Sequence, residues 1–190
     1  IRLDINNLYP SDYSKLLLNV NFWKLFSGDK LLIYQEDSIL FHGKIDKYLK
    51  YDWIGAPWPI EQDDNLYGVG NGGFSLRSRK RLIDCIENVK IDELELGEST
   101  KEYIRNTNSY FVPEDVFFSK SMIDYELGNV ARRNIAITFS QETQKSINPL
   151  GGHNFWLGEC KNYKYFNLFY LIDDYYKTVE HRYGWKFIIN

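Results

Sequence analysis

The sequence is poor in cysteine, in long apolar runs and in positive charge. Its 190 residues include only two cysteines, Cys85 and Cys160, and these lack the paired spacing of a zinc site. A disulfide framework is therefore disfavoured, and we expect free thiols in a reducing, cytoplasmic compartment. No apolar run approaches the roughly 20 residues of a membrane span. The formal net charge of −3 offers no field that would attract a nucleic-acid backbone, so nucleic acid is disfavoured as a partner.

Hydrophobic and aromatic side chains are abundant. They make up 44% and 17% of the chain, which argues against disorder and predicts one domain over 1–190 with a packed core. The fifteen tyrosines and five tryptophans suit stacking on sugar rings, although an ordinary core uses the same residues. No pattern specifies an oligomeric state.

Strand-like runs alternate with segments of helical period, which predicts an α/β fold. The run Leu31 to Tyr34 is short and continuous, so we expect a strand buried on both faces. The polar segment 61–67 is expected to be mobile, and 90–108 carries no motif. Further strands are expected at 1–5, 38–41, 74–76 and 135–139, with helices starting near Pro10, Ile45, Ser78 and Pro113 and another within 163–187.

An acidic pair follows the 31–34 strand. Gln35, Glu36 and Asp37 stand at its carboxyl end, where open α/β sheets hold their ligands. The alternative is a solvated loop after a core strand.

A glycine-rich stretch, 68–73, contains four glycines in six residues, so its backbone can approach a ligand closely. It matches neither the Walker nor the GxGxxG pattern. The basic residues that follow, from Arg77 to Arg81, suit either a pyrophosphate or a solvated face. Upstream, prolines fix the loop that carries Trp58, which suits a pocket wall or the core.

Two further segments carry candidate functional side chains. Pro113 begins a helix whose first turn holds Glu114 and Asp115, placed for chemistry or for stabilising the helix dipole. His153 stands between a diglycine and the aromatic pair that ends in Trp156. A loop there can place the imidazole in a cleft, but a lone histidine is more often structural.

In chain order, QEDSIL, GNGGFSLRSRK, PEDVFF and GGHNFW resemble a little-characterised family of glycosyltransferase-like domains of viruses and microbes. That family is similar to nucleotide-diphospho-sugar transferases of the GT-A fold, with the motif order of the Fringe and β1,3-galactosyltransferase group. The resemblance spans roughly residues 13–156. It implies a GT-A-like domain with a mixed, mostly parallel sheet flanked by helices.

The resemblance also implies roles for individual residues. Asp37 matches the last acid of the DxD motif, which with the late histidine, His153, holds Mn²⁺ or Mg²⁺. Gln35 replaces the first acid, and Glu36 would compensate. Gly72 and Gly73 match the turn that lines donor and acceptor, Arg77 would contact the donor, and Trp58 and Trp156 would contact sugar. Asp115 matches the base of the inverting group, oriented by Glu114.

The chemistry suits these residue types. A hard divalent cation prefers carboxylate oxygen, and a carboxylate across the sugar can take the proton of an attacking hydroxyl. We therefore expect transfer of a sugar, from a UDP-sugar by preference, to a hydroxyl acceptor with inversion. Only about 35 residues precede Gln35, fewer than the roughly 60 of a complete nucleotide-binding portion. Since the sequence begins with Ile1 rather than Met, part of the donor site is expected upstream.

Two rival functions remain open. A carbohydrate-binding module that retains the fold without catalysis is compatible with the missing acid at Gln35. A nucleotidyltransferase or phosphodiesterase would use similar metal ligands but release pyrophosphate or a monophosphate.

Overall fold

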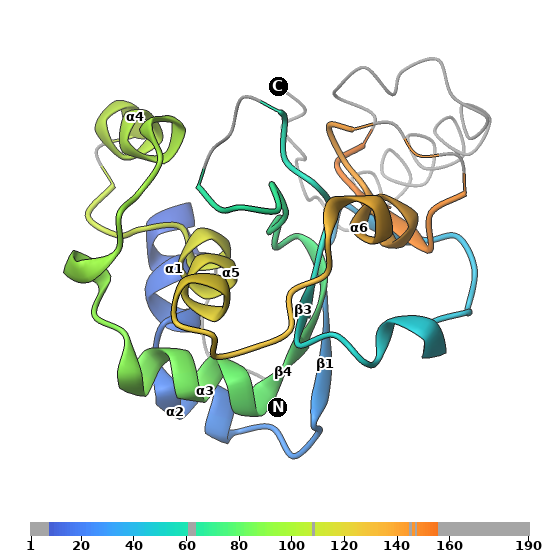
Figure 1. Ribbon diagram of the computed structural model, residues 1–190, viewed down its shortest axis with the longest axis horizontal. Coiled ribbons are helices and arrows are strands. Elements are labelled where there is room, and N and C mark those ends of the chain that lie inside the picture. The colour runs from blue at the N-terminus through green and yellow to red at the C-terminus, as the bar shows by residue number, and fades with distance from the viewer. Residues whose placement is uncertain (1–7, 61–63, 108, 145, 147, 156–190) are drawn as a thin grey trace, which may run out of the picture.

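The computed structural model describes residues 8–60, 64–107, 109–144, 146 and 148–155. It confirms a mixed α/β protein with small sheets (Figure 1). In chain order its elements are α1 (Pro10–Leu17), α2 (Val20–Lys24), β1 (Lys30–Tyr34), β2 (Ser38–Leu40), η1 (Asp46–Tyr48), β3 (Trp53–Ile54), β4 (Phe74–Ser78), α3 (Arg79–Asn88), η2 (Ile91–Glu93), α4 (Glu98–Thr107), α5 (Glu114–Asp124), α6 (Arg133–Phe139), β5 (Ser140–Gln141) and β6 (Gly151–His153).

The described strands form two three-stranded sheets, in the orders β1-β4-β3 and β2-β6-β5. Only β5 and β6 pair in parallel; the other three strand pairs are antiparallel. The expectation of a mostly parallel sheet is therefore wrong for the part of the chain described. The chain reverses direction between β3 and β4. A parallel pair would need a crossover connection, usually a helix, and the described residues of this connection form none.

Strand β4 is the central strand of the first sheet and is buried along its whole length. The prediction of a strand at 31–34 is confirmed by β1, but its burial on both faces is wrong, because β1 is an edge strand. Leu32 and Tyr34 are 38% and 53% exposed, whereas Leu31 and Ile33 pack against the core. The doubly buried strand is therefore the one that follows the glycine-rich stretch.

Two hydrophobic cores lie on opposite faces of the β1-β4-β3 sheet. Helices α1, α2, α3 and α5 cover one face, where Trp53 packs against Phe118, and α6 lies on the other side (Figure 1). There Phe74 and Leu76 of β4 pack with Phe139. Alternation along β4 points its other side chains, those of Ser75 and Arg77, at the helices. This alternation brings a charged group beneath the start of α5.

Several local predictions are corrected by the structure. The segment 135–139 belongs to helix α6 rather than to a strand, and 98–107 forms α4 where no element was expected. The helix beginning at Pro10 stops at Leu17, and α2 restarts after Asn19, whose side chain accepts a hydrogen bond from the Asn21 N–H at 2.9 Å. The helix expected near Ile45 is the short 3-10 turn η1. The predicted strand 1–5 and helix within 163–187 lie outside the described residues.

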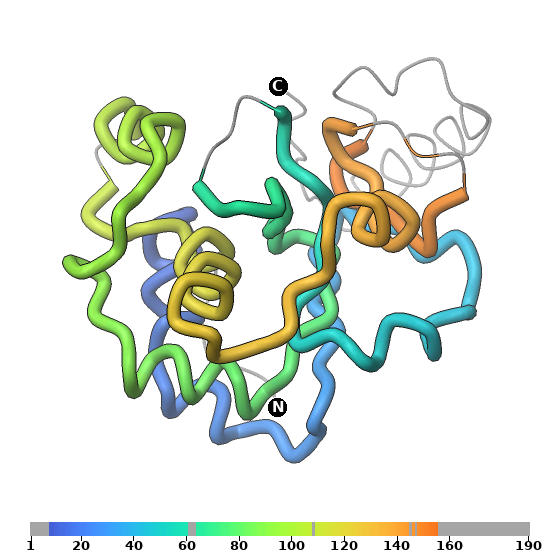
Figure 2. Tube along the Cα trace, in the orientation of Figure 1, coloured from blue at the N-terminus to red at the C-terminus, as the bar shows by residue number. Residues whose placement is uncertain are grey.

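Helices are confirmed after Ser78 and Pro113, as α3 and α5, and strands at 38–40 and 74–78. None of the described helices is long and apolar enough to cross a bilayer. In Figure 2 the loop 64–73 runs over the end of the β1-β4-β3 sheet at which β4 begins. This end of the sheet is where the candidate site lies.

Candidate functional site

An open cavity of about 650 Å³ lies where the glycine-rich stretch meets the starts of α1 and α5 and the end of β6. Its volume is within the range of small-molecule sites. The described residues that line it include seven predicted from sequence: Gln35, Trp58, Gly72, Gly73, Glu114, Asp115 and His153. The structure therefore brings together segments that lie more than 100 residues apart.

Glu114 forms an ion pair with a buried arginine, Arg77. Nη2 of Arg77 donates to Oε1 of Glu114 at 3.1 Å and to the Gly72 carbonyl at 3.0 Å, and Nε donates to the Ser75 hydroxyl at 2.8 Å. The guanidinium also lies 4.2 Å from the centroid of the Trp53 ring. Arg77 is wholly buried and is not among the residues that line the cavity. Its contacts in the structure hold Glu114, and its contact with the donor stays a prediction.

Asp115 faces the cavity from the first turn of α5. Its two carboxylate oxygens accept hydrogen bonds from the backbone N–H groups of Gly72 and Val116, at 3.1 and 2.8 Å. Burial raises the pKa of Asp115 to about 8, and the charge of Glu114 adds to this effect, while Arg77 and the Val116 N–H oppose it. Adjacent carboxyls thus have unlike environments, one paired with arginine and one with a raised proton affinity.

His153 stands between two carboxylates because of the register of the second sheet. Strand β6 is central there, and β2 pairs Ser38 with His153, so Asp37 comes next to the ring. On the other side β5 pairs Gln141 with Gly152, which places Glu142 beside His153. Nε2 lies 3.2 Å from Asp37 Oδ1, and Nδ1 lies 3.3 Å from Glu142 Oε1.

The two carboxylates control the charge of the ring. Burial alone lowers the pKa of His153, but hydrogen bonding and charge from Asp37 and Glu142 outweigh burial and raise the pKa to about 9. The Nδ1 atom is buried and has no well-aligned hydrogen bond. We therefore regard its contact with Glu142 as an ion pair that lacks the angle of a good hydrogen bond.

The glycines of the stretch 68–73 are explained by what lies on them. A Cβ on Gly73 would come within 2.4 Å of the His153 ring, and one on Gly70 within 2.2 Å of the Trp58 ring. A Cβ on Gly72 would meet Arg77 and Glu114 at 2.7 and 2.8 Å. Close approach to side chains of the site, rather than an unusual backbone angle, therefore selects glycine at these three positions.

Helix α4 forms the wall opposite His153 through Ser99, Thr100 and Tyr103. It is tied to the body by Asp64, whose carboxylate accepts hydrogen bonds from the Gly97 N–H at 3.0 Å and the Thr100 hydroxyl at 2.7 Å. Residues 61–63 lie outside the described chain, but Asp64 is fully buried. The expectation of mobility for 61–67 is therefore wrong at Asp64.

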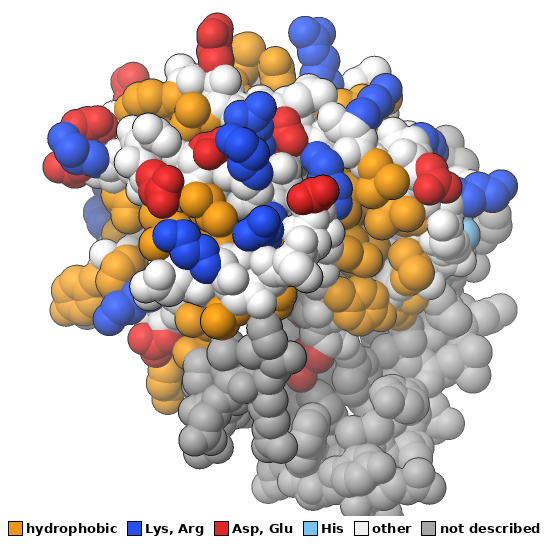
Figure 3. Space-filling model, turned by 90° about the horizontal axis from the view of Figure 1, so that it is seen from below, with side chains coloured by type: hydrophobic (Ala, Val, Ile, Leu, Met, Phe, Trp, Pro, Cys, Tyr) orange, Lys and Arg blue, Asp and Glu red, His pale blue; other side chains and the backbone are white. Residues whose placement is uncertain are grey.

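Glu36 and Asp37, like Arg77, do not line the cavity. Glu36 is exposed, and Asp37 reaches the site only through His153. The run after Arg77 forms a solvated face, with Lys80 and Arg81 lying 2.8 and 3.2 Å from Asp84. Figure 3 shows acidic and basic side chains interspersed on the face seen from below. Trp156 lies outside the described residues.

The structure adds Glu142, Asn71 and Tyr13 to the cavity wall. Asn71 accepts a hydrogen bond from the Gly73 N–H at 3.1 Å, which fixes the turn below His153. Glu142 follows the two-residue strand β5. An acidic residue just after a strand is the same sequence signal that marked Asp37. The prediction missed it because 135–139 was read as the strand.

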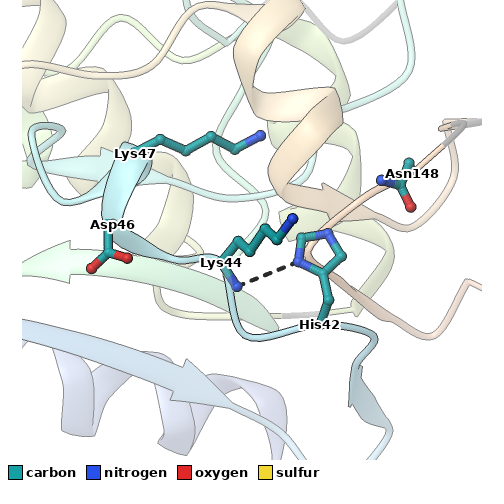
Figure 4. A pocket seen from close by; sticks show the side chains of 5 residues that line it. All are labelled: His42, Lys44, Asp46, Lys47 and Asn148. Atoms are coloured by element: carbon teal, nitrogen blue, oxygen red, sulfur yellow. Dashed lines mark hydrogen bonds between the residues drawn. The ribbon is translucent and has the colours of Figure 1, made fainter.

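A second cavity, of about 690 Å³, is lined by His42, Lys44, Asp46, Lys47 and Asn148 (Figure 4). Asp46 points away from the two lysine ammonium groups, and the backbone N–H of Lys44 donates to Nδ1 of His42 at 3.4 Å. No side chain predicted to be functional lies here. Although it is slightly larger, we favour the first cavity because carboxylates and an imidazole converge there.

The described residues form a mixed α/β protein in which carboxylates and an imidazole line one candidate site. The sequence profile of one family matches residues 4–153, so the chain belongs to the family described as "Protein of unknown function (DUF5672)". No curated protein and no solved structure matches the chain.

Proposed function

We propose that the protein is a glycosyltransferase that moves a sugar from a nucleotide-sugar donor, UDP-linked by preference, to a hydroxyl acceptor with inversion, assisted by Mn²⁺ or Mg²⁺. One observation carries the proposal: Asp115 and His153, which the resemblance assigns to base and cation site, line the same cavity. The GT-A-like fold is part of the proposal and rests on the order of the motifs along the chain.

Asp115 has the surroundings that a general base requires. Its raised pKa gives the ionised carboxylate a strong affinity for the proton of an attacking hydroxyl, and catalytic groups work best when their pKa lies near the operating pH. Arg77 balances the charge of Glu114, so Glu114 would help to orient the turn that carries Asp115.

The residues at the His153 end fit a divalent cation. No three His, Cys, Asp or Glu side chains within the described ranges form a complete cation site, but Mg²⁺ in nucleotide sites is commonly held by one or two carboxylates, with phosphates and water completing the coordination. When bound, the cation supplies positive charge to the leaving nucleoside diphosphate. His153 and a carboxylate beside it would hold the cation, and Gln35, which lines the cavity, would hydrogen-bond the donor.

The remaining walls suit the sugars. Gly72 and Gly73 form part of the cavity wall without side chains of their own, and Trp58, which is 5% exposed, offers an aromatic edge for the donor sugar. Tyr103 on α4, which is 42% exposed, would meet the acceptor on the side away from His153. Trp156 remains a proposed sugar contact.

Calorimetry with UDP and GDP, with and without Mn²⁺, tests the donor site of the whole chain. We expect binding that strengthens with Mn²⁺, followed by nucleoside diphosphate release in a screen of nucleotide-sugars. Sugar binding without nucleotide binding would replace the proposal with a carbohydrate-binding module. Release of pyrophosphate or a monophosphate would replace it with another nucleotide-processing enzyme.

A further inference from the structure

The carboxylate that faces the cavity beside His153 belongs to Glu142. Glu142 and His153 both line the cavity, whereas Asp37 does not. The Asp37 side chain is 33% exposed and that of Glu142 is 15% exposed. Asp37 is not among the residues that line the cavity, so its exposed surface lies outside the cavity. A ligand in the cavity therefore meets Glu142 before it meets the acid that the DxD resemblance selects.

The two ring nitrogens of His153 also have different surroundings. Nε2 lies 3.2 Å from Asp37 Oδ1. Nδ1 is buried, lacks an aligned partner and lies 3.3 Å from Glu142 Oε1. Adjacent ligands of a six-coordinate ion with bonds of about 2.1 Å lie about 3 Å apart. The 3.3 Å between Nδ1 and Glu142 Oε1 is close to that spacing, and both residues line the cavity.

A carboxylate behind a metal-binding imidazole has a known role. Histidines that bind metals almost always donate their second N–H to a carboxylate, carbonyl or water, which fixes the ring and its tautomer. Asp37 is placed for this role at Nε2. Glu142 and Asp115 line the same cavity, so a cation bound there would offset the charge of carboxylates on its wall.

We propose that Glu142 and Nδ1 of His153 are the protein ligands of the divalent cation, and that Asp37 orients the imidazole from behind through Nε2. This inference rests on the proposed function, because the diphosphate of the donor would complete the coordination. It reverses the roles of the two acids that flank His153.

Mn²⁺ titrations followed by electron paramagnetic resonance, with and without UDP, compare Glu142→Gln with Asp37→Asn in the whole chain. Loss of a carboxylate that hydrogen-bonds a metal-binding histidine typically weakens metal binding 10- to 100-fold, so we expect a loss in that range for Asp37→Asn. For Glu142→Gln we expect a larger loss, on the order of a hundredfold or more. Glu87→Gln makes the same charge change at an exposed pair with Lys24, 3.9 Å away, and should leave the affinity within about twofold. A larger loss in Asp37→Asn than in Glu142→Gln would overturn the inference.

Anomalous diffraction from crystals grown with Mn²⁺ and UDP gives a direct reading that does not depend on activity. The expected peak lies within bonding distance of Glu142 and His153 Nδ1; a peak bonded to Asp37 instead would overturn the assignment. If the wild type bound no Mn²⁺, this inference and the metal-dependent transferase would both be wrong. If Glu142→Gln still bound Mn²⁺ tightly and sugar transfer was intact, only the role of Glu142 would be wrong. If Mn²⁺ binding depended on Glu142 but the protein transferred no sugar, only the proposed function would be wrong.

Discussion

The imidazole ring of His153 lies face-on against Gly73. A Cβ at position 73 would stand 2.4 Å from three atoms of the ring, closer than any side-chain contact tolerates. The carbonyl of Gly73 also accepts hydrogen bonds from the Gln35 N–H and the Ser38 hydroxyl, both at 3.1 Å. The position of the ring is thus fixed by the glycine below it as well as by the carboxylates beside it.

Gly73→Ala should displace the ring of His153 and so weaken Mn²⁺ binding at least tenfold. Because the added methyl also overpacks the site, we expect a loss of about 1–3 kcal/mol in the free energy of unfolding. Electron paramagnetic resonance and urea denaturation measure the two effects. Gly43→Ala is the control, since a Cβ there meets nothing within 4 Å. Unchanged Mn²⁺ affinity in Gly73→Ala would show that the cation does not depend on the ring.

Asp115→Asn should lower the rate of sugar transfer by about 10² to 10⁴, the range for loss of a general base, and leave UDP affinity unchanged. The amide retains the size of the side chain but cannot accept the proton. Release of nucleoside diphosphate measures turnover, and calorimetry measures UDP binding. Asp124→Asn, at the far end of α5 and paired with Lys120 at 2.8 Å, is the matched control. Full turnover in Asp115→Asn would remove Asp115 from the base role.

The free energy of unfolding should depend on pH through Asp115. Its pKa is raised from 3.8 to about 8 in the folded protein, so between these values the folded state binds the proton more tightly than the unfolded chain. The contribution to stability is therefore fully present below pH 4 and is lost as pH rises through 8. Asp115→Asn should gain stability relative to wild type between pH 5 and pH 9, measured by urea denaturation. A difference that stayed constant with pH would contradict the raised pKa.

Arg77→Met should destabilise the fold by about 3–5 kcal/mol, because it leaves the buried Glu114 without its partner. Lys80→Met, on the exposed side of α3, should change stability by no more than about 0.5 kcal/mol. Adding Glu114→Gln to Arg77→Met should recover part of the loss, since no unpaired charge then remains. Urea denaturation of the wild type, Arg77→Met, Glu114→Gln and the double variant measures the coupling between the two residues. If Arg77→Met lost UDP affinity without losing stability, Arg77 would be a ligand contact after all.

The sequence allowed the residues of the cavity to be predicted better than the sheet that supports them. The glycine-rich stretch and the Pro113 helix start have local causes, namely close packing and the constraints of a first turn, and both were found. The burial of strand β1 on both faces could not be predicted correctly, because a continuous apolar run occurs both in central strands and in edge strands whose outer side chains stay half exposed. Its position depends on β4, which pairs with it from 44 residues further along.

Two other differences follow from tertiary context. The segment 135–139 is rich in residues that favour strands, but Ala136 and Phe139 bury one side of a helix against the second core. Because this segment is helical, the strand consists of Ser140 and Gln141, and Glu142 comes directly after the strand. An acid after a strand could be recognised there only once the strand was placed correctly, and parallel pairing of β5 with β6 then brings Glu142 beside His153.

The walls of the cavity come from segments that begin near Pro10 and continue to Asn154. Contacts between residues so far apart in the chain form late in folding, because each requires a large loop to close. Recovery of UDP binding after dilution from urea should therefore lag behind the recovery of helical circular dichroism. Ligand binding would then serve as a sensor of completed folding, more demanding than any measurement of secondary structure.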